Sequence, residues 1–485
     1  IMDARTGSIE GESTPLLFST RPKKPALCIQ LSSVLVACIG SVSVGLVLGY
    51  SSPALIELKT ELTADQASWF GSLPTLGALA GGPIGGFMLD FVGRRTGIAF
   101  TSVPLVAGWL LIVYSQGYLW LYAGRILTGI GMGMVSLSVP VYIGEVASKE
   151  YRGVLGALNQ LGGVIGIQIV YALAFIVHWR WMAFVCASLA TCMLLGIIFV
   201  PDSPRWLLKH KYHGEAVSSL NKLRGDKYDI EGELLEMEAN LQAHSKEKFK
   251  LSYLSKPSVY KPLVISIVLM LFQQFCGINA IIFYAGDIFA STNFSSDPNL
   301  PPVIIGGVQI VATVFCALFM DKAGRRVLLL ISGSFLTLSS GALGAYYYLK
   351  LQPNMDLSWL SLVSIIGYII GFSIGWGAIP WLLLGELFPL KVRSAASSIS
   401  VIVNWLSAFI VTKEFSTLEN LIHKYGAIWC FTGVSLLGVI FVALVLPETK
   451  GKSLEEIEEY FEPSNQRKLG NTSINEPTST RSIQS

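Results

Sequence analysis

The sequence predicts an all-α membrane protein of twelve transmembrane helices, arranged as two six-helix bundles. Its 485 residues are 52% hydrophobic and only 14% charged, whereas an average soluble domain carries about 25% charged residues. Twelve apolar segments are each long enough to cross a bilayer as a helix. A short charged motif occurs once in each half of the chain, and internal repeats of this kind indicate two related bundles with a binding site between them at mid-membrane.

The apolar segments fall into two groups of six. The first group covers residues 27–50, 67–89, 97–116, 119–144, 153–178 and 181–200. A polar stretch follows, in which EAVSSLNKLRG and IEGELLEMEANL have the spacing of short amphipathic helices. The second group covers residues 260–290, 302–320, 327–349, 358–384, 394–412 and 426–446. The predicted units are therefore an N-terminal tail, a first bundle, a helical linker, a second bundle and a C-terminal tail, over 1–26, 27–201, 202–258, 259–447 and 448–485.

The orientation of the chain follows from its positive charges, because Lys and Arg gather on the cytosolic side of a membrane protein. Twelve crossings place both termini on one side. All but six of the 35 Lys and Arg residues lie on that side, and the exceptions are Lys59, Arg125, Arg180, Lys350, Lys413 and Lys424. We expect both termini and the linker to be cytosolic.

Composition argues against several other functions. The seven cysteines all lie in apolar segments, where they are expected to pack as reduced thiols rather than form disulfides. The sequence contains no CxxC motif, histidine cluster or Ser/His/Asp constellation, so we expect no metal, no cofactor and no catalytic residues. A net charge of +3 without a basic patch gives no reason to expect nucleic acid as a partner.

The most informative stretch is Phe272–Tyr284, FQQFCGINAIIFY, which places three neutral amides inside an apolar segment. The amides are Gln273, Gln274 and Asn279, and each would be costly in hydrocarbon if unpaired. An amide offers both a donor and an acceptor, as a sugar hydroxyl does. The stretch therefore indicates a polar cavity for an uncharged, hydroxyl-rich solute, with Gly277 allowing a local bend. The alternative is that the amides join transmembrane helices to one another.

The repeated motif supplies candidate gate residues. Asp-x-x-Gly-Arg-Arg occurs in both halves, and in both a Glu precedes an Arg by seven residues. The set comprises Asp90, Arg94, Arg95, Glu145, Arg152, Asp321, Arg325, Arg326, Glu386 and Arg393. Carboxylates and guanidiniums at cytosolic helix ends can form bidentate pairs, and we expect these to join the bundles in one state and part in the other. The alternative is that the basic residues only fix topology.

Together these motifs resemble the sugar-porter family of the major facilitator superfamily. The stretch QQFCGIN resembles the family's seventh helix. The family's fourth-helix signature is similar to Gly124-Arg125 with Gly129, Gly131 and Gly133. Pro201-Asp-Ser-Pro-Arg205 and Pro447-Glu-Thr-Lys-Gly451 resemble its markers after helices six and twelve. The resemblance covers about residues 27–460. Within the family it favours the intracellular facilitative glucose transporters, and next the insect-type trehalose transporters.

The resemblance implies a set of sugar contacts, namely Gln160, Gln273, Gln274, Asn279, Trp381 and Asn404. Further lining residues are Phe283, Tyr284, Gln309, Ser373, Gly377 and Trp405. Trp381 follows Gly375-x-Gly377-x-x-Pro380, a stretch suited to a hinge. The chain departs from the family at Gln309, Ser373 and Ala408, where relatives carry Asn, Glu and a second Asn.

The function expected from these features is facilitative uniport of a neutral hexose, D-glucose in the first place, by alternating access. Proton coupling needs a titratable group in the membrane. In proton-coupled relatives an Asp follows a Gly-Tyr pair in the first helix, but here Ser51 follows Gly49-Tyr50. The alternatives are a proton-coupled sugar symporter, a trehalose transporter and a non-transporting sugar sensor; against the sensor, the C-terminal tail is short.

The termini and loops carry two further signals. Glu12 precedes Leu16-Leu17 by four residues, which matches an acidic dileucine read by clathrin adaptor proteins. It favours an endosomal or lysosomal membrane, with the plasma membrane as the alternative. Asn293-Phe-Ser295 is a glycosylation sequon in a loop expected outside the cytosol. The expected partners are thus a hexose, membrane lipid and adaptor proteins.

Overall fold

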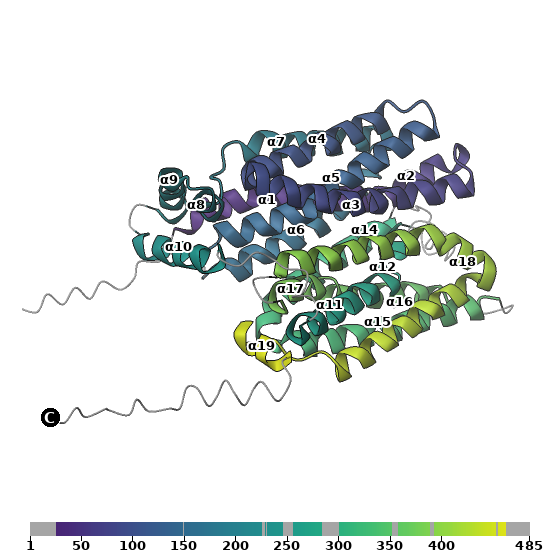
Figure 1. The fold of residues 1–485 in the computed structure, drawn as a ribbon. Helices are drawn as coiled ribbons and strands as arrows, with labels where there is room; N and C mark the ends of the chain where they lie inside the picture. The colour runs from purple at the N-terminus through teal and green to yellow at the C-terminus, as the bar shows by residue number, and fades with distance from the viewer. Residues whose placement is uncertain are drawn as a thin grey trace, which may run out of the picture.

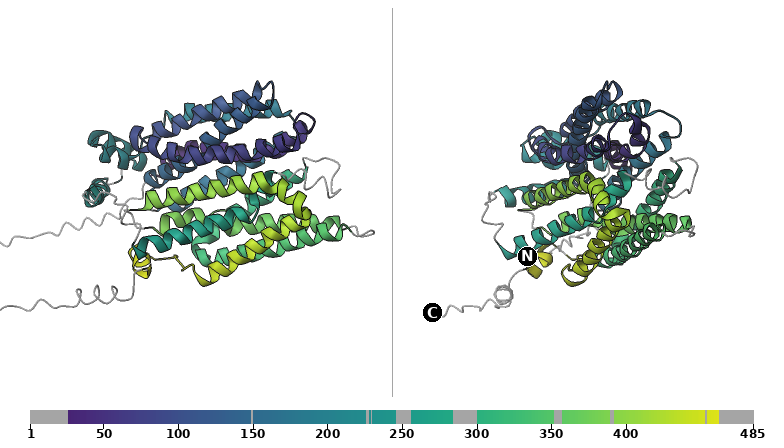
Figure 2. Two further views of the ribbon diagram at one scale, coloured as in Figure 1. Left: turned by 45° about the vertical axis from the view of Figure 1, so that its right-hand side comes forward. Right: turned by 90° about the vertical axis from the view of Figure 1, so that its right-hand side faces the viewer.

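The computed structural model describes residues 26–148, 150–225, 228, 230–245, 256–283, 300–351, 357–388, 392–452 and 454–461. Every regular element within these ranges is a helix. The helices form two stacked bundles, the first made by α1–α7 and the second by α11–α18 (Figures 1 and 2). The predicted all-α fold of two bundles is confirmed.

The first bundle consists of α1 Leu27–Gly49, α2 Ser51–Glu57, η1 Leu58–Thr60, α3 Ala64–Val92, α4 Arg94–Val113, α5 Tyr118–Val146, α6 Arg152–Leu173 and α7 Trp179–Ile197. Helix α3 begins at a capping box, in which Thr63 and Gln66 each bond the other's backbone N–H, so that two otherwise unpaired donors are satisfied. Helix α5 packs against both α3 and α4, and α6 packs against α1.

Close contact between α3 and α5 depends on glycine. A Cβ at Gly81 would lie 2.1 Å from the carbonyl oxygen of Ile130, and one at Gly129 would lie 2.3 Å from that of Pro74. Small residues spaced four apart let transmembrane helices approach to backbone contact. The glycines that resemble the family's fourth-helix signature therefore serve helix packing.

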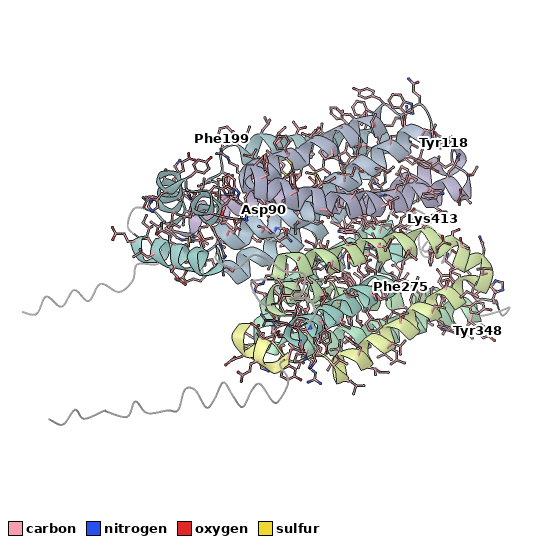
Figure 3. The ribbon with its side chains drawn as sticks, in the orientation of Figure 1. Asp90, Tyr118, Phe199, Phe275, Tyr348 and Lys413 are labelled. Atoms are coloured by element: carbon pink, nitrogen blue, oxygen red, sulfur yellow. The ribbon has the colours of Figure 1, made fainter. Side chains whose placement is uncertain are left out.

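Three short helices follow the first bundle: α8 Pro204–Lys209, α9 His213–Arg224 and α10 Glu231–Ser245. They lie at one end of the molecule, and α19 Leu454–Phe461 lies at the same end (Figure 1). We call this end the linker end and the opposite end the far end. Figure 3 shows Asp90 toward the linker end, Lys413 toward the far end and Phe275 between them.

The second bundle consists of α11 Pro257–Phe275, α12 Ile278–Phe283, α14 Leu300–Ala323, α15 Arg325–Leu349, α16 Ser358–Gly371, the π-helix η3 Phe372–Trp376, α17 Ile379–Glu386 and α18 Arg393–Leu444. Helix α18 packs on α15 and α11. The most extensive contacts between the bundles are those of α3 with α18 and of α6 with α14, and α12 also contacts α1 and α2.

The described helices contain eleven stretches long and apolar enough to cross a membrane. The last, Ala395–Leu444, has 50 residues and is broken at Ile422 and His423, whose φ angles are −123° and 61°. It therefore holds two of the predicted segments, 394–412 and 426–446, and twelve crossings result.

One predicted segment is not a single helix. Residues 260–290 were expected to cross the membrane as one helix, but α11 ends at Phe275 and α12 begins at Ile278. Gly277 between them has φ +94°, a left-handed conformation that glycine adopts readily and other residues resist. Helix α12 is described as far as Phe283.

Candidate functional site

Four predicted site residues form one continuous chain of side-chain hydrogen bonds in the second bundle. Asn279 Nδ2 donates to Gln274 Oε1 at 2.6 Å, and Gln274 Nε2 donates to Asn404 Oδ1 at 3.1 Å. Asn404 Nδ2 in turn donates to Gln273 Oε1 at 2.7 Å. All four side chains are at least 94% buried. The amides of α11, α12 and α18 are thus brought together, and each is hydrogen-bonded to the next.

The chain of amides ends on the irregular segment of the tenth crossing. Gln273 Nε2 donates to the carbonyl oxygen of Trp376 at 2.7 Å and to that of Gly377 at 3.3 Å. Pro380 has no N–H, so the Trp376 carbonyl lacks its helical donor four residues on. Gln273 supplies the missing donor. The predicted hinge at residues 375–380 is therefore irregular, and it is bonded directly to the predicted site.

Other predicted lining residues carry polar atoms without partners. Trp381 and Trp405 lie with ring centroids 6.4 Å apart at 56°. The buried atoms Trp405 Nε1, Ser373 Oγ and Gln309 Oε1 have no hydrogen-bond partner among the described residues. Buried polar groups are nearly always paired in proteins, so each of these atoms lacks a partner that a bound solute could supply.

The remaining predicted residues either have no described hydrogen bond to this cluster or lie partly or wholly outside the description. Gln160 is half-buried on α6 and makes no described hydrogen bond to the amide chain. Phe283 ends α12, but its side chain is not described. Tyr284, the dileucine residues Glu12, Leu16 and Leu17, and the sequon at Asn293 lie outside the described residues.

A buried arginine in the first bundle has a hydroxyl where a carboxylate could have been. Arg125 is fully buried and donates to the carbonyl oxygens of Phe70 at 3.2 Å and Val47 at 3.1 Å, and to Ser51 Oγ. Its guanidinium carbon lies 4.9 Å from the Phe70 ring centroid and 5.7 Å from that of Tyr50. Within the described ranges, no carboxylate lies at ion-pair distance from it.

At the linker end, the first bundle holds an ion network built on Glu145. Arg94 donates to both carboxylate oxygens of Glu145, at 2.7 and 2.8 Å, and Ser203 Oγ donates to the same group. Asp202 Oδ1 accepts the backbone N–H groups of Arg94 and Arg95, both at 3.2 Å. Asp202 therefore caps the N-terminus of α4, where a negative charge is favoured.

The second bundle repeats this network with the same kinds of residues. Arg325 donates to Glu386 Oε1 from Nε at 3.2 Å and from Nη2 at 3.0 Å, and Thr449 Oγ1 donates to Glu386 Oε2 at 2.6 Å. Glu448 accepts the backbone N–H groups of Arg325 and Arg326 at 2.9 and 3.0 Å. Each network thus ties the start of one helix to the end of another within its own bundle.

In this conformation the gate residues do not pair across the bundle interface, and the expected pairing between bundles stays a prediction for the other state. Arg94–Glu145 and Arg325–Glu386 each join helix ends that are neighbours in one bundle. Arg152 makes no described ion pair, and Arg393 donates to the carbonyl oxygen of Phe388. Burial, and after it the charge of Arg205, lowers the pKa of Arg393. The side chain of Asp321 is not described, and Asp90 lies 3.6 Å from Arg94 and 3.5 Å from Lys209.

Asp202, Ser203, Glu448 and Thr449 were not among the predicted site residues. A signal was available, because each bundle is followed by Pro, an acid and a hydroxyl residue in the same order. The acid caps a helix, and the hydroxyl bonds the partly buried Glu145 or Glu386. Comparing the two halves at this position would have found both pairs.

The cap at Glu448 predicts a pH-dependent contribution to stability. Burial raises the pKa of Glu448. Hydrogen bonds from the backbone N–H groups of Lys450, Arg325, Arg326 and Thr449 together lower the pKa by more, so the net shift is downward. Because the pKa of Glu448 is lower in the folded state, its ionised carboxylate stabilises the fold at pH values above its unfolded-state pKa of about 4.3. This contribution is lost as the pH falls through the folded-state pKa.

We expect Glu448→Gln to lower the unfolding temperature of purified protein at pH 7, by a helix-terminus charge effect of about 0.3–1 kcal/mol. The difference from wild type should shrink as the pH falls below about 4.3. Thermal unfolding at pH 7 and pH 4 measures this, with Glu61→Gln, an exposed acid without a described partner, as the control. An equal difference at both pH values would contradict the cap.

At the far end, polar contacts join the two bundles directly. Lys413 Nζ lies 2.9 Å from Asp65 Oδ1 and 4.9 Å from the Trp69 ring centroid. Ser68 Oγ donates to the Lys413 carbonyl oxygen at 2.9 Å. These contacts join the first turns of α3 to α18, and they hold the bundles together at this end of the molecule.

The family described as "Sugar (and other) transporter" matches residues 32–461. The facilitated glucose transporter member 8 of solute carrier family 2 from Bos taurus is 40% identical over 477 residues, covering 93% of this chain and 98% of the relative. The facilitated trehalose transporter Tret1 of Bombyx mori is 39% identical over 460 residues, covering 92% of this chain and 89% of the relative.

Solved structures give the same fold. The proton:xylose symporter XylE bound to 6-bromo-6-deoxy-D-glucose superimposes with a TM-score of 0.77 and 26% identity, over 90% of this chain and all of that one. The inward open conformation of XylE from E. coli gives 0.73 and 25% identity, over 89% of this chain and all of that one. Both confirm the predicted fold.

Proposed function

The chain belongs to the sugar transporter family of the major facilitator superfamily, and from that membership we propose that it carries a neutral hexose across a membrane by facilitative uniport. D-glucose is the first candidate substrate. The observation that carries this proposal is the chain of Gln273, Gln274, Asn279 and Asn404, whose described hydrogen bonds include no charged side chain. Neutral amides suit a solute that offers hydroxyls and no charge.

Alternating access fits the way the two bundles are held. The linker-end networks on Glu145 and Glu386 lie inside their own bundles, so each bundle can move as a unit. The contacts of Lys413 with Asp65, Ser68 and Trp69 hold the bundles at the far end. We infer that the gate opens at one end while such contacts close the other, and that the sugar site between them is exposed to each side in turn.

Uniport rather than symport is supported by the surroundings of Arg125. A proton-coupled carrier needs a group in the membrane that gains and loses a proton. Arg125 is paired with the Ser51 hydroxyl and with backbone carbonyl groups, and none of these titrates near neutral pH. A proton-coupled symporter remains the second candidate function, because the solved relative XylE is described as a proton:xylose symporter.

The substrate proposal is tested by uptake into liposomes that contain the purified protein. We expect saturable uptake of labelled D-glucose, with other hexoses and trehalose as competitors. Transport of trehalose in place of hexoses would assign the substrate class of the Bombyx mori relative. Sugar binding without uptake of any sugar would favour a non-transporting sensor instead.

We further propose that both termini are cytosolic and that the protein resides in an endosomal or lysosomal membrane. The Lys and Arg distribution supports the orientation, and a glycan at Asn471, the sequon of the C-terminal tail, would contradict it. The acidic dileucine motif of Glu12 with Leu16-Leu17 supports retention in these internal membranes. Replacing both leucines by alanine should move the protein to the cell surface, as measured by imaging; a mutant that stays inside the cell would refute the sorting signal.

A further inference from the structure

The contact between α6 and α14 contains a glutamine outside the predicted site. The Gln168 amide lies directly on the backbone of α14 at Gly306: a Cβ added there would lie 1.9 Å from Gln168 Oε1 and 3.0 Å from its Cδ. No real Cβ tolerates such a distance, so a larger residue at 306 would displace the amide. Glycine at this position therefore makes room for Gln168.

The carbonyl oxygen of this amide is buried and has no described partner, and the same is true of Gln309 Oε1. Gln309 follows Gly306 by three residues on α14, which places the two on neighbouring turns of one helix face. Unpaired buried carbonyl groups are costly, and native proteins seldom retain them without a reason. In contrast, the amides of α11, α12 and α18 are bonded to one another. Among the described residues, each bundle thus contributes one buried glutamine carbonyl oxygen without a hydrogen-bond partner, Gln168 in the first and Gln309 in the second.

The position of Gln168 connects it to the site. Tyr171, one turn farther along α6, donates from its hydroxyl to the Ile282 carbonyl oxygen of α12 at 3.2 Å. Helix α12 also carries Asn279, and α14 carries Gln309. Gln168 therefore stands where the first bundle meets the two second-bundle helices that carry these amides.

We propose that Gln168 is a specificity-determining residue of the sugar site. Its carbonyl accepts a hydroxyl of the sugar from the side of the first bundle, while Gln309 accepts one from the second. This inference rests on the proposed sugar transport. It adds an acceptor contributed by the first bundle, so that the solute bonds both bundles at the α6–α14 contact. A packing role for Gln168 is the competing explanation, and it would affect every sugar alike.

The test measures KM for D-glucose and for each monodeoxy-D-glucose in liposomes, with wild type and Gln168→Leu. Leucine keeps most of the volume and removes the acceptor. We expect KM for glucose to rise about two- to tenfold, the effect of one neutral hydrogen bond. For the deoxy sugar that lacks the hydroxyl bound by Gln168, wild type and variant should have the same KM. The same fold-change for every sugar, or no change, would overturn the proposal.

A second pair of variants tests the same contact without altering Gln168. Gly306→Ala should displace the amide and reproduce the selectivity of Gln168→Leu. Gly307→Ala is the matched control, because a Cβ there meets nothing within 4 Å, and its sugar preferences should equal wild type. Loss of selectivity in both glycine variants would contradict the role of Gln168. Failure of wild type to transport any sugar would instead refute the proposed function.

Discussion

Alanine at position 277 is expected to remove most of the folded, active protein. Gly277 has φ +94°, and an L-residue in a left-handed conformation costs about 1–2 kcal/mol. The added Cβ would also lie 2.4 Å from Cδ2 of Phe431, and overpacking of this kind costs about 1–3 kcal/mol. The unfolding temperature of Gly277→Ala should therefore fall clearly, and the yield of monodisperse protein with it.

Gly433→Ala provides the matched control. Gly433 lies in α18, exposed, and a Cβ there meets nothing within 4 Å. Alanine in a helix is favoured over glycine by about 1 kcal/mol, so this variant should unfold at or above the wild-type temperature. If Gly277→Ala unfolded at the same temperature as Gly433→Ala, the break between α11 and α12 would not depend on glycine.

Removing the central amide of the chain should have the second large effect. Asn404 is fully buried and bonds both Gln273 and Gln274. Asn404→Leu leaves one acceptor and one donor without partners, at about 1–3 kcal/mol each. Part of this loss falls on sugar binding, because the freed amides no longer hold each other in place. We expect at least about tenfold weaker D-glucose binding, as measured by titration of purified protein.

Ser400→Ala separates this effect from a general loosening of the helices. Ser400 lies one turn from Asn404 on α18, is fully buried, and bonds Ser266 of α11 at 2.8 Å. It therefore joins the same two helices outside the amide chain. Its variant should lose stability while keeping its affinity for sugar. Equal loss of affinity in both variants would mean that the amide chain has no special part in binding.

Sequence reasoning could predict the features that depend on composition and local pattern. Twelve apolar segments, the repeat around Arg94 and Arg325, and the three amides near Gly277 are visible without coordinates. The bend at Gly277 could also be anticipated, because a glycine among buried amides allows a local change of direction. The resemblance to a family supplied Trp381 and Asn404, which no local pattern identifies.

What the sequence could not show is which side chain meets which. Arg94 and Glu145 are 51 residues apart, and only the packing of α4 against α5 shows that they pair within one bundle. Gln168 is one of the few polar residues in α6, and only the structure shows that it lies against Gly306 of α14. Such contacts join distant segments, and their geometry depends on helix packing that a linear pattern does not specify.

The measurement that tests the account most directly is the steady-state ratio of inside to outside D-glucose in liposomes under an imposed pH gradient. The proposal of uniport rests on Ser51 standing beside Arg125 in place of an acid, and no carboxylate among the described residues lies at ion-pair distance from Arg125. The ratio should reach one and stay there, with or without the gradient, and the rate should fall in Asn404→Leu. Accumulation above the outside concentration that a protonophore abolishes would contradict uniport and assign a proton-coupled symporter instead.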